Sequence, residues 1–209
     1  MKDLLIKKWR DLGLINDEKV FKAFAAVQRE QFVLAHLKSE AYCDAPLRIG
    51  FEQTISQPLT VLVMTELLSL NKTDKVLEVG AGSGYAAAII SQLSNQVFAT
   101  EIIPQLARQA QKNLAKAKID NVTVVQCDGS QGYTSEAPYD KIIVSAACSE
   151  IHQVLIEQLT EGGIIVAPVG GCTTQVMTRG IRAGQALKES HFGNYIFVPL
   201  TGKFGLQRD

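Results

Sequence analysis

The stretch Val76-Leu77-Glu78-Val79-Gly80-Ala81-Gly82-Ser83-Gly84-Tyr85 decides the fold. A short apolar run leads into a turn with glycine at every second position, and a helix-like stretch follows from Ala86 to Leu93. Glycine lets the backbone turn tightly and come close to a ligand, and the free N–H groups of a new helix point toward that ligand. The stretch therefore predicts a strand, a ligand-binding turn and a helix.

The spacing of the glycines distinguishes this turn from a dinucleotide site. The pattern from Glu78 to Gly84 is Glu-x-Gly-x-Gly-x-Gly, whereas dinucleotide-binding turns have Gly-x-Gly-x-x-Gly. An acid beside the turn suits a ligand with a positive amine, such as the methionine part of S-adenosylmethionine, and suits a pyrophosphate poorly. A nicotinamide dehydrogenase is therefore disfavoured, and the remaining alternative is a glycine-rich turn that binds nothing.

Two further acids lie at the ends of later apolar runs. Glu101 follows Val97-Phe98-Ala99-Thr100 and lies 21 residues after Gly80. In nucleotide-binding α/β units, a carboxylate at about this spacing accepts hydrogen bonds from ribose hydroxyls. Glu101 alone is as easily an exposed strand-end acid, and the glycine turn is what favours the ribose role. Asp128, which precedes Gly129, either accepts from an adenine amino group or caps the next turn.

Strands and helices alternate through the middle of the chain. Strands are predicted at 75–80, 96–101, 122–126, 141–145 and 163–168, and helices at 84–93, 104–117 and 151–159. Near-continuous apolar strands between amphipathic helices predict a mostly parallel sheet with helices on both faces. The expected fold class is a Rossmann-like α/β fold of the kind that binds S-adenosylmethionine.

The two ends of the chain differ from this alternation. Helical spacing predicts helices within residues 1–40, with Asp17 as an N-cap, then a loop over 42–57 and a helix over 58–70. Two strands of an antiparallel edge are predicted at 174–179 and 194–200. We expect one domain over 1–209, composed of N-terminal helices and a loop (1–57), an α/β core (58–170) and C-terminal strands (171–209).

The composition is ordinary for a soluble globular enzyme. Lys plus Arg equals Asp plus Glu at 21 each, so no broad basic face for nucleic acid is implied. The four cysteines lack a Cys-x-x-Cys pair and indicate reduced thiols, and the three isolated histidines lack metal-ligand spacing. No apolar run reaches the ~20 residues of a membrane span, and the N-terminus is no signal peptide. We expect a cytoplasmic protein without metal, membrane or nucleic-acid partner.

A second segment, Ile49-Gly50-Phe51-Glu52-Gln53-Thr54-Ile55-Ser56-Gln57-Pro58, places hydroxyls and an amide just before a predicted helix. The free N–H groups of a helix start favour an anion. Thr54 or Ser56 can also simply cap that helix, and chemistry alone puts the cap ahead of a substrate role.

This segment, together with the glycine turn, closely resembles the protein-L-isoaspartate O-methyltransferase family. The glycine turn occurs in many methyltransferases, whereas Thr54-Ile55-Ser56-Gln57-Pro58 is far more specific. The resemblance covers roughly residues 25–200. The other stretches that carry it are Val27 to Val33, Ala41 to Asp44, Asp128-Gly129 with Gly132-Tyr133, Ala137 to Asp140, Leu159 to Gly170, and Phe197 to Leu200.

The resemblance implies a reaction, a cofactor and a set of site residues. Family members use S-adenosylmethionine to methylate the free α-carboxylate of isoaspartyl residues in damaged proteins, so isoaspartyl proteins and peptides are the expected partners. Ser56 matches the active-site position, Glu101 the ribose position and Asp128 the adenine position. The expected cofactor-binding residues are Glu78, Gly80, Gly82, Ser83, Gly84, Tyr85, Glu101, Ile102, Asp128 and Gly129. The expected substrate-binding residues are Gln53, Thr54, Ile55 and Ser56.

The expected mechanism needs few catalytic groups. A carboxylate is already ionised at neutral pH and attacks without a general base. Holding it in line with the methyl group is worth ~7 kcal/mol or more, and we expect Ser56 and nearby N–H groups to do this. Cys127 and Cys148 lack a histidine at a telling position, so a place in the core or wall is favoured over a nucleophilic role.

Four positions depart from the residues usual in the family. They are Leu34, Ala45, Glu52 and Leu59. Ala45 and Glu52 lie in the expected substrate segment, where they bear on affinity and peptide preference. Two alternatives therefore stay open: a divergent methyltransferase acting on another substrate, such as RNA or a small molecule, and a binding module with little turnover. A turnover assay separates the binding module from an enzyme.

Overall fold

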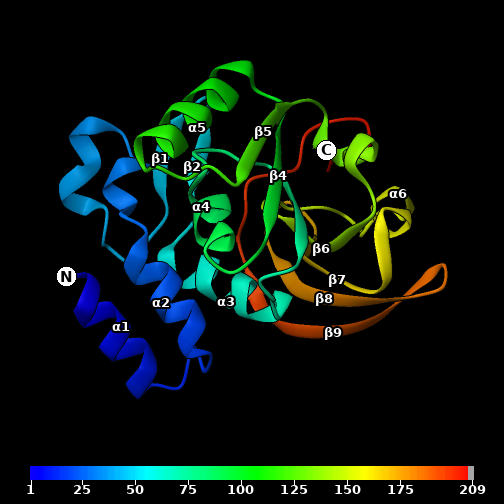
Figure 1. Ribbon diagram of the computed structural model, residues 1–209, viewed down its shortest axis with the longest axis horizontal. Coiled ribbons are helices and arrows are strands. Elements are labelled where there is room, and N and C mark those ends of the chain that lie inside the picture. Colours follow the sequence, from blue (N-terminus) through cyan, green and yellow to red (C-terminus); the bar gives the residue numbers. More distant parts are fainter. Residues whose placement is uncertain (207–209) are drawn as a thin grey trace.

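Seven strands form one mixed sheet in the computed structural model, which describes residues 1–206 (Figure 1). Five strands run parallel and the two C-terminal strands run antiparallel to their neighbours. This confirms the predicted sheet and its antiparallel edge. In sheet order the strands are β5 (Val122–Gln126), β4 (Gln96–Glu101), β3 (Lys75–Val79), β6 (Tyr139–Val144), β7 (Leu159–Gly170), β8 (Gln175–Ala183) and β9 (Ala186–Tyr195).

Side chains of the central strands point alternately into two apolar cores, one on each face of the sheet. In β3, Val76 packs into the first core and Leu77 into the second, as the period of a strand requires. The first face is covered by α3 (Pro58–Leu68), α4 (Tyr85–Ser91) and α5 (Pro104–Lys116), and the second by the short α6 (Gln153–Glu157) (Figure 1). The prediction of helices on both faces is confirmed.

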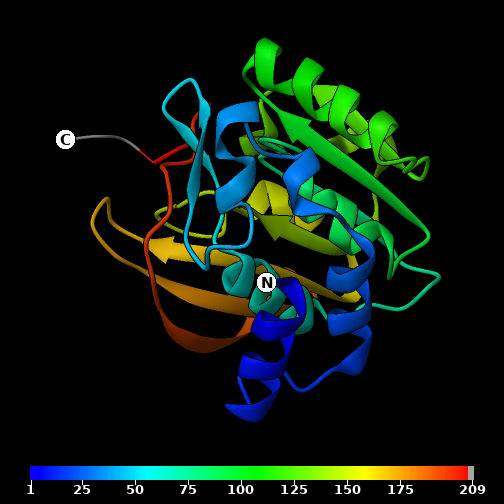
Figure 2. The same cartoon turned by 90° about the vertical axis from the view of Figure 1, so that its left-hand side faces the viewer.

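The N-terminal region adds a third layer on the first face. Helices α1 (Lys2–Asp11) and α2 (Glu18–Ala26) lead into two 3-10 turns, η1 (Arg29–Gln31) and η2 (Ala35–Glu40). Asp17 caps α2 as predicted, because its Oδ1 accepts from the Lys19 N–H at 2.8 Å. Helix α2 packs on α3 and α4 (Figure 2), so the N-terminal helices extend the first core.

The predicted loop over 42–57 is wrong in its second half, which forms an antiparallel hairpin. Its strands are β1 (Leu47–Gly50) and β2 (Gln53–Ile55). They are too short for a periodic signal, and the turn between them places Phe51 and Glu52 at φ 52° and 59°. Turns of this kind usually carry Asn, Asp or Gly at such positions, so nothing in the sequence marked the hairpin.

The predicted strand over 194–200 is also wrong, because the last strand ends at Tyr195. Strand β9 is mostly polar and exposed, so it has no apolar pattern. The apolar segment after it crosses the carboxyl end of the sheet, where Pro199 pairs with Ala147 and Leu200 is buried, while Ile196 is 81% exposed. Residues 207–209 of the predicted C-terminal unit lie outside the described residues.

Candidate functional site

The order of the strands reverses between β3 and β6. The chain runs from β3 outward to β4 and β5, then returns to β6 on the other side of β3. At such a point the connections leave in opposite directions, and a crevice opens beyond the carboxyl ends of the strands. Three adjoining pockets lie there, and Thr54 and Ser145 line all of them.

The three pockets differ in the residues that line them. The turn pocket lies at the glycine turn and includes Glu78, Ser83, Tyr85, Ile55 and Ser56. The strand-end pocket includes Gly80, Glu101, Ile102, Gly129 and Gln53, together with the C-terminal residues Leu200 and Thr201. The outer pocket, of about 540 Å³, lies between Ser56 and the segment Asn194 to Val198.

The glycine turn is held by the neighbouring strand. The N–H groups of Gly80 and Ala81 both donate to the Thr100 carbonyl at 2.9 Å. Gly80 and Gly82 have φ values of 91° and 53°, which favour glycine, and both line the crevice. Gly84 instead serves packing, because a Cβ there would lie 3.3 Å from Leu114. Of the predicted glycines, Gly84 alone does not line the three pockets.

Glu101 holds the glycine turn and has unused acceptor capacity. Its Oε2 accepts from the Gly82 N–H at 2.8 Å and its Oε1 from the Ile103 N–H at 2.9 Å. Each carboxylate oxygen can accept a second hydrogen bond. Glu101 therefore fixes the turn and still offers acceptors to the strand-end pocket.

Glu78 is a buried carboxyl group with spare bonding capacity. Its Oε1 accepts from the Ser145 hydroxyl at 3.0 Å, and the Ala87 N–H lies near the carboxyl group, while its buried Oε2 accepts no hydrogen bond of normal geometry among residues 1–206. Burial raises the pKa of Glu78 to about 8, against the lowering effect of the Ser145 hydrogen bond. An unpartnered buried carboxyl oxygen in the turn pocket is suited to a cationic ligand group.

Asp128 is engaged by the chain itself. Its Oδ1 accepts from the N–H and the hydroxyl of Ser130, and its Oδ2 from the Gln131 amide and the Lys203 N–H. The turn-capping alternative is therefore observed, and the carboxylate does not line the pockets, whereas Gly129 does. A role for Asp128 toward adenine stays a prediction.

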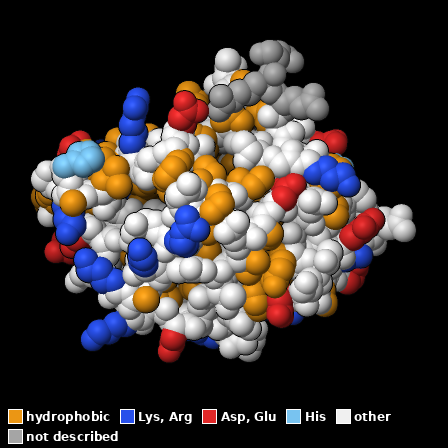
Figure 3. Space-filling view, turned by 90° about the horizontal axis from the view of Figure 1, so that it is seen from above, with side chains coloured by type: hydrophobic (Ala, Val, Ile, Leu, Met, Phe, Trp, Pro, Cys, Tyr) orange, Lys and Arg blue, Asp and Glu red, His pale blue; other side chains and the backbone are white. Residues whose placement is uncertain are grey.

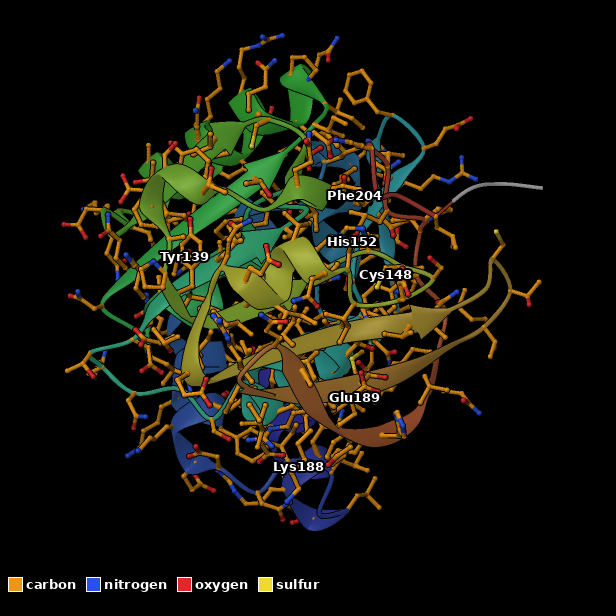
Figure 4. All side chains as sticks on the ribbon, turned by 90° about the vertical axis from the view of Figure 1, so that its right-hand side faces the viewer. Tyr139, Cys148, His152, Lys188, Glu189 and Phe204 are labelled. Carbon is orange, nitrogen blue, oxygen red and sulfur yellow. The ribbon has the colours of Figure 1, made fainter. Side chains whose placement is uncertain are left out.

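The same contacts hold the end of the described chain against the site. The Phe204 N–H donates to the Ser130 hydroxyl at 3.0 Å. The Phe204 ring stacks on that of His152, with centroids 3.7 Å apart (Figure 4). Leu200 and Thr201, which line the strand-end pocket, immediately precede this anchored segment.

Ser56 lies where the turn pocket and the outer pocket meet. Its carbonyl accepts from Arg29 Nη1 at 2.8 Å, and its hydroxyl has no hydrogen-bond partner within the described chain. Helix α3 begins at Pro58 with Gln57 as its N-cap and no side-chain cap bond. The interpretation of Thr54 or Ser56 as a helix cap is therefore wrong, and the Ser56 hydroxyl is available to a ligand.

The crevice contains few acidic or basic side chains, and all of them are acids. Among the described residues that line the three pockets, the acidic and basic side chains are Glu78 and Glu101, and Glu78, with its pKa of about 8, is mostly protonated at neutral pH. The outer pocket is lined by uncharged side chains, and its Ile196 is 81% exposed. On the face seen in Figure 3, Lys and Arg are interspersed with Asp and Glu. The turn and strand-end pockets thus suit a cationic ligand. The outer pocket beside them has no charged side chain that would select its ligand by charge.

Sequence reasoning missed Ser145 and the C-terminal wall. Ser145 ends a predicted strand at the same edge of the sheet as Gly80 and Glu101. Its position at that strand end could therefore have identified it as a site residue. Leu200 and Thr201 reach the site only through contacts of distant segments. Within residues 1–206, no cluster of three His, Cys, Asp or Glu suits a metal, and no helix is long and apolar enough to cross a membrane.

The thiols lie outside the crevice. Cys148 is buried and its Sγ donates to the Pro168 carbonyl at 3.6 Å (Figure 4). Burial raises its pKa to about 12, which leaves it without thiolate at neutral pH. Cys127 is half-buried, and neither thiol lines the three pockets. Cys148 is a core residue as interpreted, whereas Cys127 belongs neither to the two apolar cores nor to the pocket walls.

Comparison with known proteins identifies a family for this chain. The family model described as Protein-L-isoaspartate(D-aspartate) O-methyltransferase (PCMT) matches residues 1–205. A protein-L-isoaspartate O-methyltransferase of Methanoculleus marisnigri is 46% identical over 193 residues, which are 92% of this chain and 88% of that relative.

Solved structures agree with this result. A protein-L-isoaspartate O-methyltransferase structure has a TM-score of 0.88 at 27% identity, over 98% of this chain and 67% of that one. A Plasmodium falciparum PCMT protein in complex with S-adenosyl-L-homocysteine has a TM-score of 0.82 at 24% identity, over 96% and 97% of the two chains. At that identity the second likeness concerns the fold alone.

Proposed function

Because this chain belongs to the protein-L-isoaspartate(D-aspartate) O-methyltransferase family, we propose that its crevice holds S-adenosylmethionine along the glycine turn and the substrate carboxylate at Ser56. The enzyme methylates isoaspartyl residues in proteins, a protein-repair reaction, with S-adenosylmethionine as the methyl donor. The observation that carries the residue-level proposal is the place of Ser56, between the turn pocket, which contains the carboxyl group of Glu78, and the outer pocket, whose lining side chains are uncharged.

The walls of the crevice fit the cofactor. S-adenosylmethionine supplies a methyl group activated by a positively charged sulfur, and it also carries an ammonium group. Gly80 and Gly82 let the backbone approach it closely, Glu101 offers acceptors for ribose hydroxyls, and the unpartnered Oε2 of Glu78 suits the ammonium. Ser83, Tyr85, Ile102 and Gly129 complete the walls.

The substrate carboxylate meets neutral donors in this crevice. Among the described lining residues no lysine or arginine is available to pair with it. The Ser56 hydroxyl orients the carboxylate, with Gln53, Thr54 and Ile55 as neighbouring walls. A carboxylate without an ion-pair partner keeps its electron pair available for attack on the methyl carbon. The uncharged outer pocket admits polypeptide of either charge beside the isoaspartyl residue.

Methyl transfer to matched peptides tests the activity. We expect base-labile methyl label from S-adenosylmethionine on a synthetic isoaspartyl peptide and none on its normal aspartyl twin. The twin controls for any carboxylate that merely reaches the crevice. Binding of the cofactor by calorimetry without transfer to either peptide would contradict the enzyme and leave a binding module.

We expect cofactor binding to release protons at neutral pH. The pKa of Glu78 is raised from 4.5 to about 8, so the folded protein keeps this proton between those values while the unfolded chain loses it. The stabilising contribution of the group is therefore full below pH 4.5 and is lost as the pH rises through 8. A cofactor ammonium beside the carboxyl lowers its pKa and expels the proton.

Calorimetry measures this release. S-adenosylmethionine is titrated at pH 7 in buffers of different ionisation enthalpy, and the slope of heat against that enthalpy should correspond to about one proton per site. In Glu78→Gln, which keeps the shape of the side chain, the slope should vanish. A slope of zero in the wild-type protein would show that the cofactor ammonium does not bind beside Glu78.

The lining of the crevice bears on the partner, and the cysteines bear on the compartment. We propose that isoaspartyl proteins, and not nucleic acids, are the partners, because the lining residues described carry no cation to hold phosphates. Cys43, Cys127 and Cys148 are free thiols, which supports work in the reducing cytoplasm.

A further inference from the structure

Arg29 is an arginine with 0% of its surface exposed. Its guanidinium forms no ion pair within the described chain, and its Nε has no hydrogen-bond partner there. Arginine is almost never fully buried unless it is paired, because removing its charge from water costs free energy. Burial lowers the pKa of this guanidinium, which reflects the same cost. The contacts that offset this cost show which parts of the chain the guanidinium holds together.

The guanidinium joins the two ends of the β1–β2 hairpin. Its Nη1 donates to the Ser56 carbonyl at 2.8 Å and its Nη2 to the Ala45 carbonyl at 3.4 Å. Ala45 lies two residues before β1, and Ser56 immediately follows β2. The planar fork of an arginine can hold two acceptors at once, which lysine cannot do with the same geometry. Arg29 thus fixes the base of the hairpin that leads to Ser56.

The same guanidinium lies on the cofactor side of the crevice. Its Cζ is 4.9 Å from the centre of the Tyr85 ring. Tyr85 is the first residue of α4, directly after the glycine turn, and is 1% exposed. The hairpin also closes on the turn itself, because a Cβ on Gly82 would lie 3.3 Å from Ile49 Cδ1. One buried side chain therefore contacts both the Ser56 segment and the helix that begins at the glycine turn.

We propose that Arg29 is a positioning residue for methyl transfer. By holding the Ser56 carbonyl and the Tyr85 ring together, it sets the distance between the Ser56 hydroxyl and the glycine turn. The inference rests on the proposed role of Ser56, since Arg29 touches neither substrate nor cofactor. In-line methyl transfer depends on the distance between the carboxylate oxygen and the methyl carbon, and a misplacement of 1 Å can lower the rate about 100-fold.

A double-mutant cycle tests this inference with Arg29→Lys, Ser56→Ala and the variant carrying both. We expect Arg29→Lys to lower kcat about tenfold, the effect of one lost hydrogen bond, while the Kd for S-adenosylmethionine changes less than about threefold. In the Ser56→Ala background, Arg29→Lys should lower kcat by less than about twofold, because the hydroxyl that it positions is gone. Should Arg29→Lys fail to fold, Arg29→Met takes its place in the cycle, since it keeps an unbranched apolar stem and removes the hydrogen bonds to both carbonyls.

Arg179→Lys is the matched control. Arg179 Nε donates to the Leu67 carbonyl at 2.8 Å, at the far end of α3 from the crevice. Its replacement should lower the melting temperature and leave kcat unchanged. If Arg29→Lys behaves like this control, or if its loss of kcat adds fully to that of Ser56→Ala, the positioning role is overturned. If Ser56→Ala itself keeps full kcat, the proposed role of Ser56 fails instead.

Discussion

Ser56→Ala should lower kcat on an isoaspartyl peptide by roughly 10–100-fold and raise KM several-fold. The substrate carboxylate loses its negative charge as the ester forms, so a hydroxyl that only stabilised that charge would slow the reaction. The hydroxyl must therefore act by orientation, which is why the larger loss is expected in kcat. Its position between the two pockets, with no partner of its own among the described residues, makes it available for this role.

Steady-state kinetics with the isoaspartyl peptide measure both constants, and calorimetry measures the Kd for S-adenosylmethionine. The Kd should stay unchanged, because the cofactor contacts proposed above come from the glycine turn, Glu78 and Glu101. Ser56→Thr keeps a hydroxyl and should retain more turnover than Ser56→Ala. Full turnover with an unchanged KM in Ser56→Ala would leave orientation to the backbone N–H groups alone.

The parts of this site that were predictable are the ones encoded locally. The glycine turn and Glu101 each follow an apolar run, and parallel strands bring their carboxyl ends to one edge whatever the rest of the chain does. Glu78, Glu101 and the glycine turn could therefore be predicted to lie beside one another from the sequence alone.

The rest depends on contacts between distant segments. Arg29 meets the Ser56 carbonyl across 27 residues, and Asp128 meets the Lys203 N–H across 75. No local pattern records either contact. The hairpin was hidden for a different reason, since Phe51 and Glu52 occupy a turn conformation that their residue types do not announce.

Glu101→Ala should raise the Kd for S-adenosylmethionine about 100-fold or more. The change removes the acceptors proposed for the ribose, and hydrogen bonds to charged groups are worth about 1.5–3 kcal/mol each. It also leaves the N–H groups of Gly82 and Ile103 without their partner, so the turn loses its order and the melting temperature falls. Calorimetry on folded protein, with circular dichroism as the check of folding, separates the two effects.

Glu101 and Asp128 look alike in the sequence, as acids at the ends of neighbouring strands, and their bonding separates them. Asp128 already accepts four hydrogen bonds from the chain, which fills a carboxylate, whereas Glu101 accepts two. The isosteric pair Glu101→Gln and Asp128→Asn should therefore differ, with the larger rise in Kd for Glu101→Gln. A larger rise for Asp128→Asn would show that affinity depends more on Asp128 and the C-terminal wall it anchors. If the Kd rises more for Glu101→Gln than for Asp128→Asn, the ligand-binding acid is identified by its unused hydrogen-bond acceptors. Its position at a strand end does not distinguish it, because Asp128 shares that position.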